Sequence, residues 1–446
     1  MSSQRSATAG ESVAGKPQAR RAATASIAGT TLEFYDFTIY GLASALVFSQ
    51  VFFPTVSPTI GLLSAFATFG VGFLMRPIGG FLFGHIGDRF GRKNALVTTL
   101  LMMGISTVLI GCIPSFDSIG YWAPALLVIL RLFQGLAYGG EWGGAVLMAG
   151  EHAPKNKRIL YSALPNVGVS AGSLLGNLAF LLVASLGPDV MNQWAWRLPF
   201  WLGAILVIVG LMIRVGVDES PEFLKTVKND GPARLPIVEC FRRYPLQILL
   251  ITGVMAGGAT AAYINIAYSV SFATGAGVDR GIPLLAIMIS NAMQLVLIPL
   301  FAILASRVGL GRVFFFGTLA WAVLMLFLFP ALGSGNITLI FLAYLIPYGI
   351  GFCPMNATIP SLFAESFDPR VRYSGLVGAQ LGTAIAGFTP FVAVLVNTAA
   401  GPTAVGLMGS GMLLLAAICG MILAHGLVKA KQIIPDKLPA RSHTSI

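Results

Sequence analysis

The sequence is dominated by apolar stretches that are long enough to cross a lipid bilayer as helices, which takes about 20 residues each. Twelve such stretches occur, at 25–50, 58–83, 94–113, 122–149, 159–186, 198–215, 246–274, 281–305, 313–332, 337–364, 374–398 and 402–428. Only 10% of the residues are charged, whereas soluble domains have about a quarter. Because so few ionisable groups cannot cover a surface that faces water, the pattern predicts an all-α membrane protein with twelve transmembrane helices.

The basic residues are distributed unevenly along the chain, and their distribution predicts how the helices are oriented. If the N-terminus is cytosolic, 23 of the 28 lysines and arginines fall on cytosolic segments, while the outside connections hold Arg197 and Arg280. Positive residues favour the cytosolic side, so both termini of this multi-pass cell-membrane protein are expected in the cytosol. The net charge of +11 is therefore a topology signal, and no nucleic-acid motif accompanies it.

The two halves of the chain resemble each other at equivalent loops. After the fourth apolar stretch Glu151 precedes Arg158 by seven positions, and 214 residues later Glu365 precedes Arg372 by the same spacing. Such internal repeats are typical of transporters. The pattern predicts two six-helix pseudo-repeats. The expected parts are a cytosolic N-terminal tail (1–24), a first bundle (25–215), a central cytosolic loop (216–245), a second bundle (246–428) and a cytosolic C-terminal tail (429–446).

Several segments resemble one family of transporters. "GHIGDRFGRK" (84–93) is similar to the loop motif after the second helix of the major facilitator superfamily, and "LVILRLFQGLA" (127–137) to its fourth-helix motif. "LEFYDFTIYG" (32–41) and "RLFQGLAYGGEWGGAV" (131–146) resemble the metabolite:proton symporter branch of that superfamily. The resemblance implies the major facilitator fold and alternating access, with transport of organic acids or zwitterionic osmolytes together with protons.

The loop motif also implies a cytosolic gate in which salt bridges between helices break when the two halves rock. The residues assigned to this gate are Gly84, Gly87, Asp88, Arg89, Gly91, Arg92, Lys93, Glu151, Arg158, Glu365 and Arg372. The plainer interpretation of these charges is the cytosolic excess of basic residues. Ser306 stands where the second half would repeat Asp88, so the gate in that half is expected to be weaker or differently built.

Charged residues inside the apolar stretches are the strongest functional signal, because each costs about 3 kcal/mol to insert. The residues assigned to proton coupling are Glu33, Asp36, Arg76, Arg131 and Glu141. On a helical rise of about 1.5 Å per residue, Asp36, Arg76 and Glu141 all lie roughly 12 to 14 Å from the cytosolic helix ends. An excess of acids in one layer makes simultaneous ionisation costly, so one of them is expected to bind and release a proton. A purely structural ion pair of Asp36 with Arg76 is the alternative.

Polar side chains at helical spacing are candidates for substrate binding. A sector of about 100° on the fourth helix holds Arg131, Gln134, Tyr138, Glu141 and Trp142. Arg131 has no acid on its own turn, so it either binds a substrate carboxylate or couples to the proton site. The residues assigned to substrate binding are Tyr40, Arg131, Gln134, Tyr138, Asn166, Asn265, Tyr268 and Asn291. For each neutral residue, ordinary helix packing is the competing interpretation.

The expected function is proton-coupled uptake of a small organic acid such as a dicarboxylate, a keto acid or a hydroxylated cyclic acid. Two alternatives stay open, namely uptake of a zwitterionic osmolyte of the proline or betaine type, and efflux of a drug or metabolite. An enzyme is not expected, because the four histidines and four cysteines are dispersed without metal-ligand or nucleophile spacing. The proton gradient takes the place of a cofactor, no metal is expected, and the partners are the substrate, protons and membrane lipid around a functional monomer.

Overall fold

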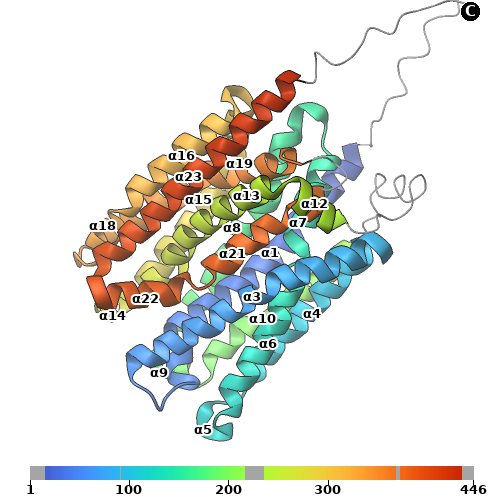
Figure 1. Ribbon diagram of the computed structural model, residues 1–446. Coiled ribbons are helices and arrows are strands. Elements are labelled where there is room, and N and C mark those ends of the chain that lie inside the picture. Colours follow the sequence, from blue (N-terminus) through green and yellow to red (C-terminus); the bar gives the residue numbers. More distant parts are fainter. Residues whose placement is uncertain (1–15, 91, 216–235, 368–371, 434–446) are drawn as a thin grey trace, which may run out of the picture.

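The computed structural model describes residues 16–90, 92–215, 236–367 and 372–433, and these residues form helices and short connections (Figure 1). In the first half, long helices alternate with short ones at the loops, because runs of apolar residues are interrupted by Gly, Pro and Ser. The long helices are α1 (Lys16–Leu46), α3 (Pro58–Phe90), α4 (Arg92–Cys112), α6 (Trp122–Tyr138) continued by α7 (Glu141–Glu151), α8 (Arg158–Ala184) and α10 (Leu198–Val215). The short ones are α2 (Phe48–Val51), α5 (Phe116–Ile119) and α9 (Pro188–Gln193).

The second half repeats the alternation, with two of its long helices interrupted by a π-helical segment. Its elements are α12 (Pro236–Arg243), α13 (Pro245–Tyr263), the π-helix η3 (Ile264–Tyr268), α14 (Ser269–Gly275), α15 (Gly281–Val308), α16 (Leu310–Met325), α17 (Leu328–Leu332), α18 (Ile337–Tyr344), the π-helix η4 (Leu345–Gly351), α19 (Phe352–Glu365), α20 (Arg372–Gly375), α21 (Val377–Ala386), α22 (Thr389–Ala400) and α23 (Pro402–Ile433). Such interruptions are frequent at functional sites.

The predicted number of spans is confirmed. Within the described part of the chain, nine helical stretches are long and apolar enough to cross a membrane, and 97–112 and 310–325 are shorter apolar helices. The remaining span is α1, which contains Glu33 and Asp36 and is correspondingly less apolar. The outward faces carry large apolar side chains, for example Ile205 and Met212 of α10, which are 60% and 65% exposed. A lipid environment covers such faces.

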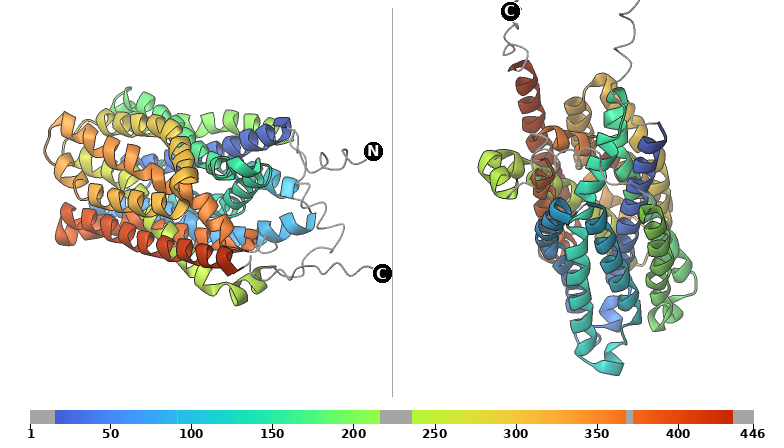
Figure 2. Two further views of the ribbon diagram at one scale, coloured as in Figure 1. Left: turned by 90° about the horizontal axis from the view of Figure 1, so that it is seen from above. Right: turned by 90° about the vertical axis from the view of Figure 1, so that its right-hand side faces the viewer.

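Each half packs mainly on itself, and the halves meet along a few helices. In the first half α1 lies against α8 and α3 against α6, while in the second half α13 lies against α21 and α23. Across the interface α8 contacts α15 and α19, and α3 contacts α21 and α22. Figure 1 shows most of the blue-to-green helices of the first half on one side of this interface, and the second half, from the lime-green α13 to the red α23, on the other. Figure 2 shows that α1 begins and α23 ends at the same end of the bundle, as an even number of spans requires.

Glycines allow α3 and α6 to touch through their backbones. A Cβ atom added to Gly135 would overlap the carbonyl oxygen of Gly72, and one added to Gly139 would overlap the carbonyl oxygen of Arg76. Small residues of this kind let membrane helices approach closely. The contact brings Arg76 of α3 and Arg131 of α6 into the same region of the first half, and it thereby positions the site described next.

Candidate functional site

A cavity lies between the two halves at the middle of the bundle, and its empty space is about 710 Å³ including its opening. Its walls come from both halves. They are Phe34, Arg76, Trp142, Asn166, Val169, Ser173, Met255, Gly258, Ala259, Ala262, Tyr263, Ile266, Tyr348, Phe352, Met355, Asn356, Ile359 and Thr383. Among these described residues Arg76 is the charged one, and the rest combine aromatic faces with a few amide and hydroxyl groups.

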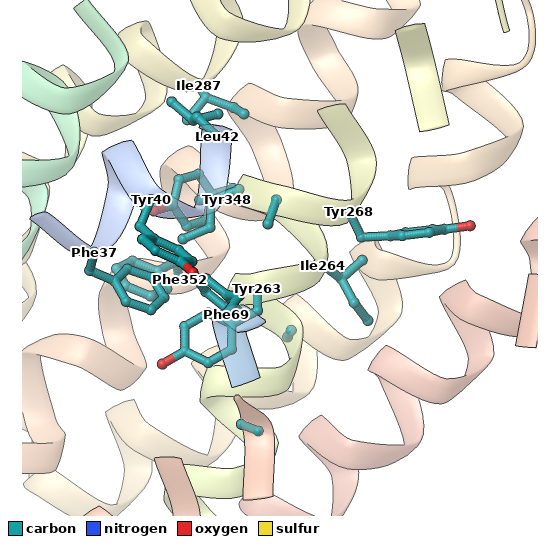
Figure 3. Close-up of a cluster of buried hydrophobic side chains, with 14 of the residues drawn as sticks. Phe37, Tyr40, Leu42, Phe69, Tyr263, Ile264, Tyr268, Ile287, Tyr348 and Phe352 are labelled. Atoms are coloured by element: carbon teal, nitrogen blue, oxygen red, sulfur yellow. The ribbon is translucent and has the colours of Figure 1, made fainter. Parts of the chain in front are cut away.

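Aromatic side chains close the cavity on the side of the loops that are predicted to lie outside the cell. The ring of Tyr263 lies 5.0 Å from that of Phe37 and 5.9 Å from that of Phe69, measured between centroids. Figure 3 shows these three rings together, Phe37 and Phe69 from the first half and Tyr263 from the second. Phe388 packs on Gly70 beside them. Since the rings come from both halves, separating the halves on this side would open the cavity in that direction.

Arg76 is a buried cation at the cavity wall, with only 4% of its surface exposed. Its Nη1 lies 3.8 Å from Oε1 of Glu33, so the acid that pairs with Arg76 is Glu33 and not Asp36, the partner in the alternative interpretation. The guanidinium also lies 4.3 Å from the ring centre of Phe73 and 4.8 Å from that of Tyr138. Such aromatic contacts stabilise a cation in a dry site. The long ion-pair distance leaves guanidinium donors available for a carboxylate in the cavity.

Asp36 lies in a separate polar cluster inside the first half and is not among the residues that line the cavity. Its carboxylate accepts hydrogen bonds from Thr107 of α4, from Gln134 Nε2 at 3.3 Å and from the Tyr138 hydroxyl at 3.3 Å. Gly203 of α10 covers the other side, since a Cβ there would lie 3.9 Å from Asp36 Oδ1. A carboxylate with these donors can be held as an anion, and its enclosure lets it bind a proton.

Arg131 is linked to Asp36 through Gln134. Its Nη1 donates to Gln134 Oε1 at 3.0 Å, and the other end of that amide donates to Asp36. The guanidinium lies 4.1 Å from the ring centre of Tyr40 and packs against Gly72. Arg131, Gln134, Tyr138 and Tyr40 are therefore enclosed within the first half beside Asp36, outside the cavity lining.

On the opposite side of the cavity, hydrogen bonds connect the two halves. Asn166 of α8 donates from Nδ2 to the carbonyl of Asn356 at 2.7 Å and accepts from Trp142 Nε1 at 3.3 Å. Tyr373 of α20 donates to the carbonyl of Gly140 at 2.8 Å. That carbonyl lies at the break between α6 and α7, where the helical hydrogen-bond ladder is interrupted. These contacts join the two halves on this side of the bundle.

Tyr373→Phe is expected to favour opening on this side, because it removes one hydrogen bond between the halves and keeps the ring. A neutral hydrogen bond contributes about 0.5 to 1.5 kcal/mol, so the ratio of open to closed molecules should rise by about 2- to 12-fold. Alkylation of a cysteine placed at Ser173 in the cavity would report the change, with Tyr161→Phe in the same background as control. Equal alkylation rates in both variants would contradict this.

Other assigned residues lie elsewhere. Asn265 donates to the carbonyl of Ala261 and lies 3.1 Å from the sulfur of Met325, and Tyr268 packs on Phe272 and Phe329. Asn291 is fully buried in α15, and Glu141 is buried at the start of α7. Of the eight residues assigned to substrate binding, Asn166 lines the cavity.

The residues assigned to the cytosolic gate are described in part. Glu151 ends α7 and Arg158 begins α8, and Glu365 and Arg372 occupy the equivalent positions between α19 and α20. This agrees with a repeat of the two halves. Gly91 lies outside the described residues, and so do the surroundings of Gly84 and Gly87 and the side chains of Asp88, Arg89, Arg92 and Lys93.

Sequence reasoning missed several cavity residues. Trp142, Asn356 and Thr383 line the cavity, and Thr107 contacts Asp36 from α4. The spacing of Trp142 places it on the same helix face as Glu141 and Tyr138, but it is not among the residues assigned to substrate binding. For Thr107 the sequence has no signal, because a threonine in an apolar helix most often bonds to its own backbone.

The comparisons with known proteins agree with this architecture. A family model described as "Sugar (and other) transporter" matches residues 22–239, and one described as "MFS/sugar transport protein" matches residues 163–375. The chain is 42% identical over 387 residues to the shikimate transporter of Escherichia coli (strain K12), which covers 85% of this chain and 88% of the relative. It is 34% identical over 393 residues to the proline/betaine transporter of the same organism, covering 84% and 77%.

A solved structure shares the fold. The xylose transporter XylE from E. coli, in a partially occluded inward-open conformation, superimposes with a TM-score of 0.73 and covers 97% of this chain and 100% of its own. The two sequences are 17% identical, so this likeness concerns the arrangement of the helices. The close sequence relatives, in contrast, carry information about the family.

Proposed function

Because this chain belongs to the major facilitator superfamily, in its branch of bacterial metabolite transporters, we propose that it imports a small organic acid together with protons by alternating access. It is a multi-pass membrane transporter and not an enzyme. The observation that carries the proposal is the single charged group, Arg76, among the described side chains that line the cavity. A buried guanidinium with free donors favours an anionic substrate and binds a carboxylate through two parallel hydrogen bonds.

The other walls of the cavity favour a ring that carries hydroxyl groups. Asn166, Ser173 and Thr383 offer amide and hydroxyl groups, while Trp142, Tyr263 and Phe352 offer flat apolar faces. Shikimate, the compound named in one relative, is a hydroxylated cyclic acid and has both features. We therefore place a hydroxylated cyclic acid ahead of a dicarboxylate or a keto acid, with its carboxylate on Arg76.

Coupling to protons would arise because Glu33 and the substrate carboxylate compete for Arg76. Glu33 is its counter-ion at 3.8 Å, and a substrate carboxylate would take over that position. A proton on Glu33 or Asp36 then keeps the charge of this buried layer balanced, because extra anions in a dry region are costly. The substrate and the proton would therefore cross together, and release of one on the cytosolic side would favour release of the other.

The proposal is tested in proteoliposomes that contain the purified protein and an internal pH-sensitive dye. Addition of shikimate or another small organic acid should acidify the interior, while empty liposomes stay unchanged. Acidification with proline or betaine alone would favour uptake of an osmolyte. The similarity to the proline/betaine transporter supports that alternative. No response to any compound, with insertion of the protein verified, would count against proton-coupled uptake and favour efflux.

Arg76→Gln should raise the KM for the acid at least tenfold, because a hydrogen bond to a charged group contributes about 1.5 to 3 kcal/mol. Arg76→Lys should recover only part of the loss, since an ammonium group lacks the planar pair of donors. Arg20→Gln, at an exposed position near the start of α1, is the matched control and should leave the KM unchanged. An unaltered KM in Arg76→Gln would place the substrate carboxylate elsewhere.

A further inference from the structure

Thr107 lies at the centre of the polar cluster around Asp36 and belongs to α4, a helix without any residue assigned to proton coupling or to substrate binding. Its side-chain oxygen is within hydrogen-bond distance of three groups, namely the Asp36 carboxylate, Gln134 Nε2 at 2.7 Å and the carbonyl of Met103 at 3.0 Å. Thr107 is 0% exposed and Asp36 is 4% exposed. The three contacts therefore form in a region that bulk water does not reach.

The contacts of Gln134 determine which way its amide faces. Arg131 has donors and no acceptor, so it must bond to the amide oxygen of Gln134, as it does at 3.0 Å. The amide nitrogen is thereby directed at Thr107 and Asp36. Because an amide nitrogen only donates, Gln134 Nε2 cannot accept a hydrogen bond from protonated Asp36. Its hydrogen bond to Thr107 uses one of the two lone pairs of the Thr107 oxygen.

The hydroxyl group of Thr107 then has one proton and two acceptors. It can donate to the Asp36 carboxylate or to the Met103 carbonyl, and not to both. If Asp36 is ionised, the hydroxyl donates to the carboxylate. If Asp36 is protonated, the acid donates to the second lone pair of Thr107, and the hydroxyl turns to Met103. In both states the hydroxyl proton of Thr107 has an acceptor, and in the protonated state the acid proton of Asp36 has one too, so the change of state leaves neither proton unsatisfied.

We propose that Thr107 is a positioning residue for the proton on Asp36, a hydroxyl that reverses its hydrogen bond when Asp36 gains or loses the proton. The inference rests on the proposed function, since it concerns the proton that is carried with the substrate. Rotation of one hydroxyl group lets the carboxyl group change state without a movement of α1 or α4. The backbone carbonyl of Met103 is the fixed acceptor that makes the reversal possible.

Few other groups around Asp36 could both donate a hydrogen bond to its carboxylate and accept one from its acid form. From α6 it meets Gln134 and Tyr138, with Arg131 behind Gln134, and from α10 it faces Gly203. On its own helix Glu33 lies one turn away and pairs with Arg76 of α3. The Tyr138 hydroxyl is at 3.3 Å and is a weaker partner than Thr107. The hydrogen bond that reverses is therefore the one between Asp36 and the Thr107 hydroxyl of α4.

The test compares Thr107→Val, which keeps the shape and removes the hydroxyl, with Thr107→Ser, which keeps the hydroxyl. Three quantities are measured in proteoliposomes, namely substrate-driven proton uptake across pH 5 to 8, accumulation under a pH gradient, and exchange of labelled for unlabelled substrate. For Thr107→Val we expect about tenfold lower accumulation and a pH profile whose midpoint moves by about half a unit or more. Exchange should persist, and Thr107→Ser should restore the wild-type profile.

The outcomes separate the two proposals. If the wild-type protein shows no substrate-driven proton uptake, the proposed function fails before Thr107 is considered. If the wild type couples and Thr107→Val has the same pH profile, the role of Thr107 is overturned while the proposed function stands. A Thr107→Ser variant that behaves like Thr107→Val would also overturn it. Persistent exchange in Thr107→Val shows that the protein is folded, and a loss of exchange in both variants would mean that Thr107 serves packing.

Discussion

Asp36→Asn is expected to abolish accumulation of the substrate against its gradient while the protein still exchanges substrate across the membrane. A pH difference of one unit provides about 1.4 kcal/mol per proton, which corresponds to about tenfold accumulation for each proton carried. Asparagine has the shape of aspartate and still accepts a hydrogen bond from Thr107, but it binds no proton. The accumulation ratio of the variant should therefore fall to about one.

The measurement uses the same proteoliposomes with and without an imposed pH gradient. Exchange of labelled for unlabelled substrate moves no net protons, so it should remain within about twofold of the wild-type rate. Asp189→Asn is the control, because this acid is exposed at the start of α9 and contacts none of the polar cluster. Full accumulation by Asp36→Asn would exclude Asp36 as the proton carrier and leave Glu33 and Glu141 as candidates.

Gly135→Ala is expected to be the most destabilising small substitution in the first half. The added methyl group would overlap the carbonyl of Gly72, and neither the backbone of α3 nor that of α6 can move aside without separating the helices. Overpacking of this kind costs about 1 to 3 kcal/mol and occasionally more. Separation of α3 from α6 would also displace Arg76 and Arg131, so transport should fall together with thermal stability.

Gly411→Ala on α23 is the matched control, because a methyl group there meets no atom within 4 Å. Alanine favours a helix by about 0.8 to 1 kcal/mol over glycine, so this variant should be unchanged or slightly more stable. The two variants are compared by their unfolding temperature in detergent and by the yield of monodisperse protein. Equal unfolding temperatures would show that α3 and α6 can separate without loss, contrary to the close backbone contact.

The buried charged residues show which features of the site can be predicted from the sequence and which cannot. Helical rise predicts that Asp36, Arg76 and Glu141 lie at similar depth, because depth depends only on position along a helix. It does not predict that Arg76 pairs with Glu33 or that Asp36 faces Thr107 and Gln134. Those pairings depend on how each helix is rotated and on which helices are neighbours, and both are set by contacts between residues far apart in the chain.

The residues assigned to substrate binding differ from those that line the cavity for the same reason. Arg131, Gln134 and Tyr138 share a helix face, as their spacing predicts, but that face is turned toward Asp36 rather than toward the cavity. Asn166 lines the cavity because α8 lies at the interface between the halves. Spacing identifies which side chains lie together on a helix, and it does not identify what the helix faces.

The sequence by itself determines that the chain is a helical membrane protein with twelve spans, since a bilayer admits only segments whose backbone groups are satisfied internally. Its local motifs also identify the superfamily, because they lie within short continuous segments. The tertiary structure decides that Arg76 reaches the cavity and that Asp36 is enclosed by α4, α6 and α10. The cause lies in the close packing of glycines such as Gly72 and Gly135, which fixes the distance and rotation of helices that the chain connects only through long stretches of sequence.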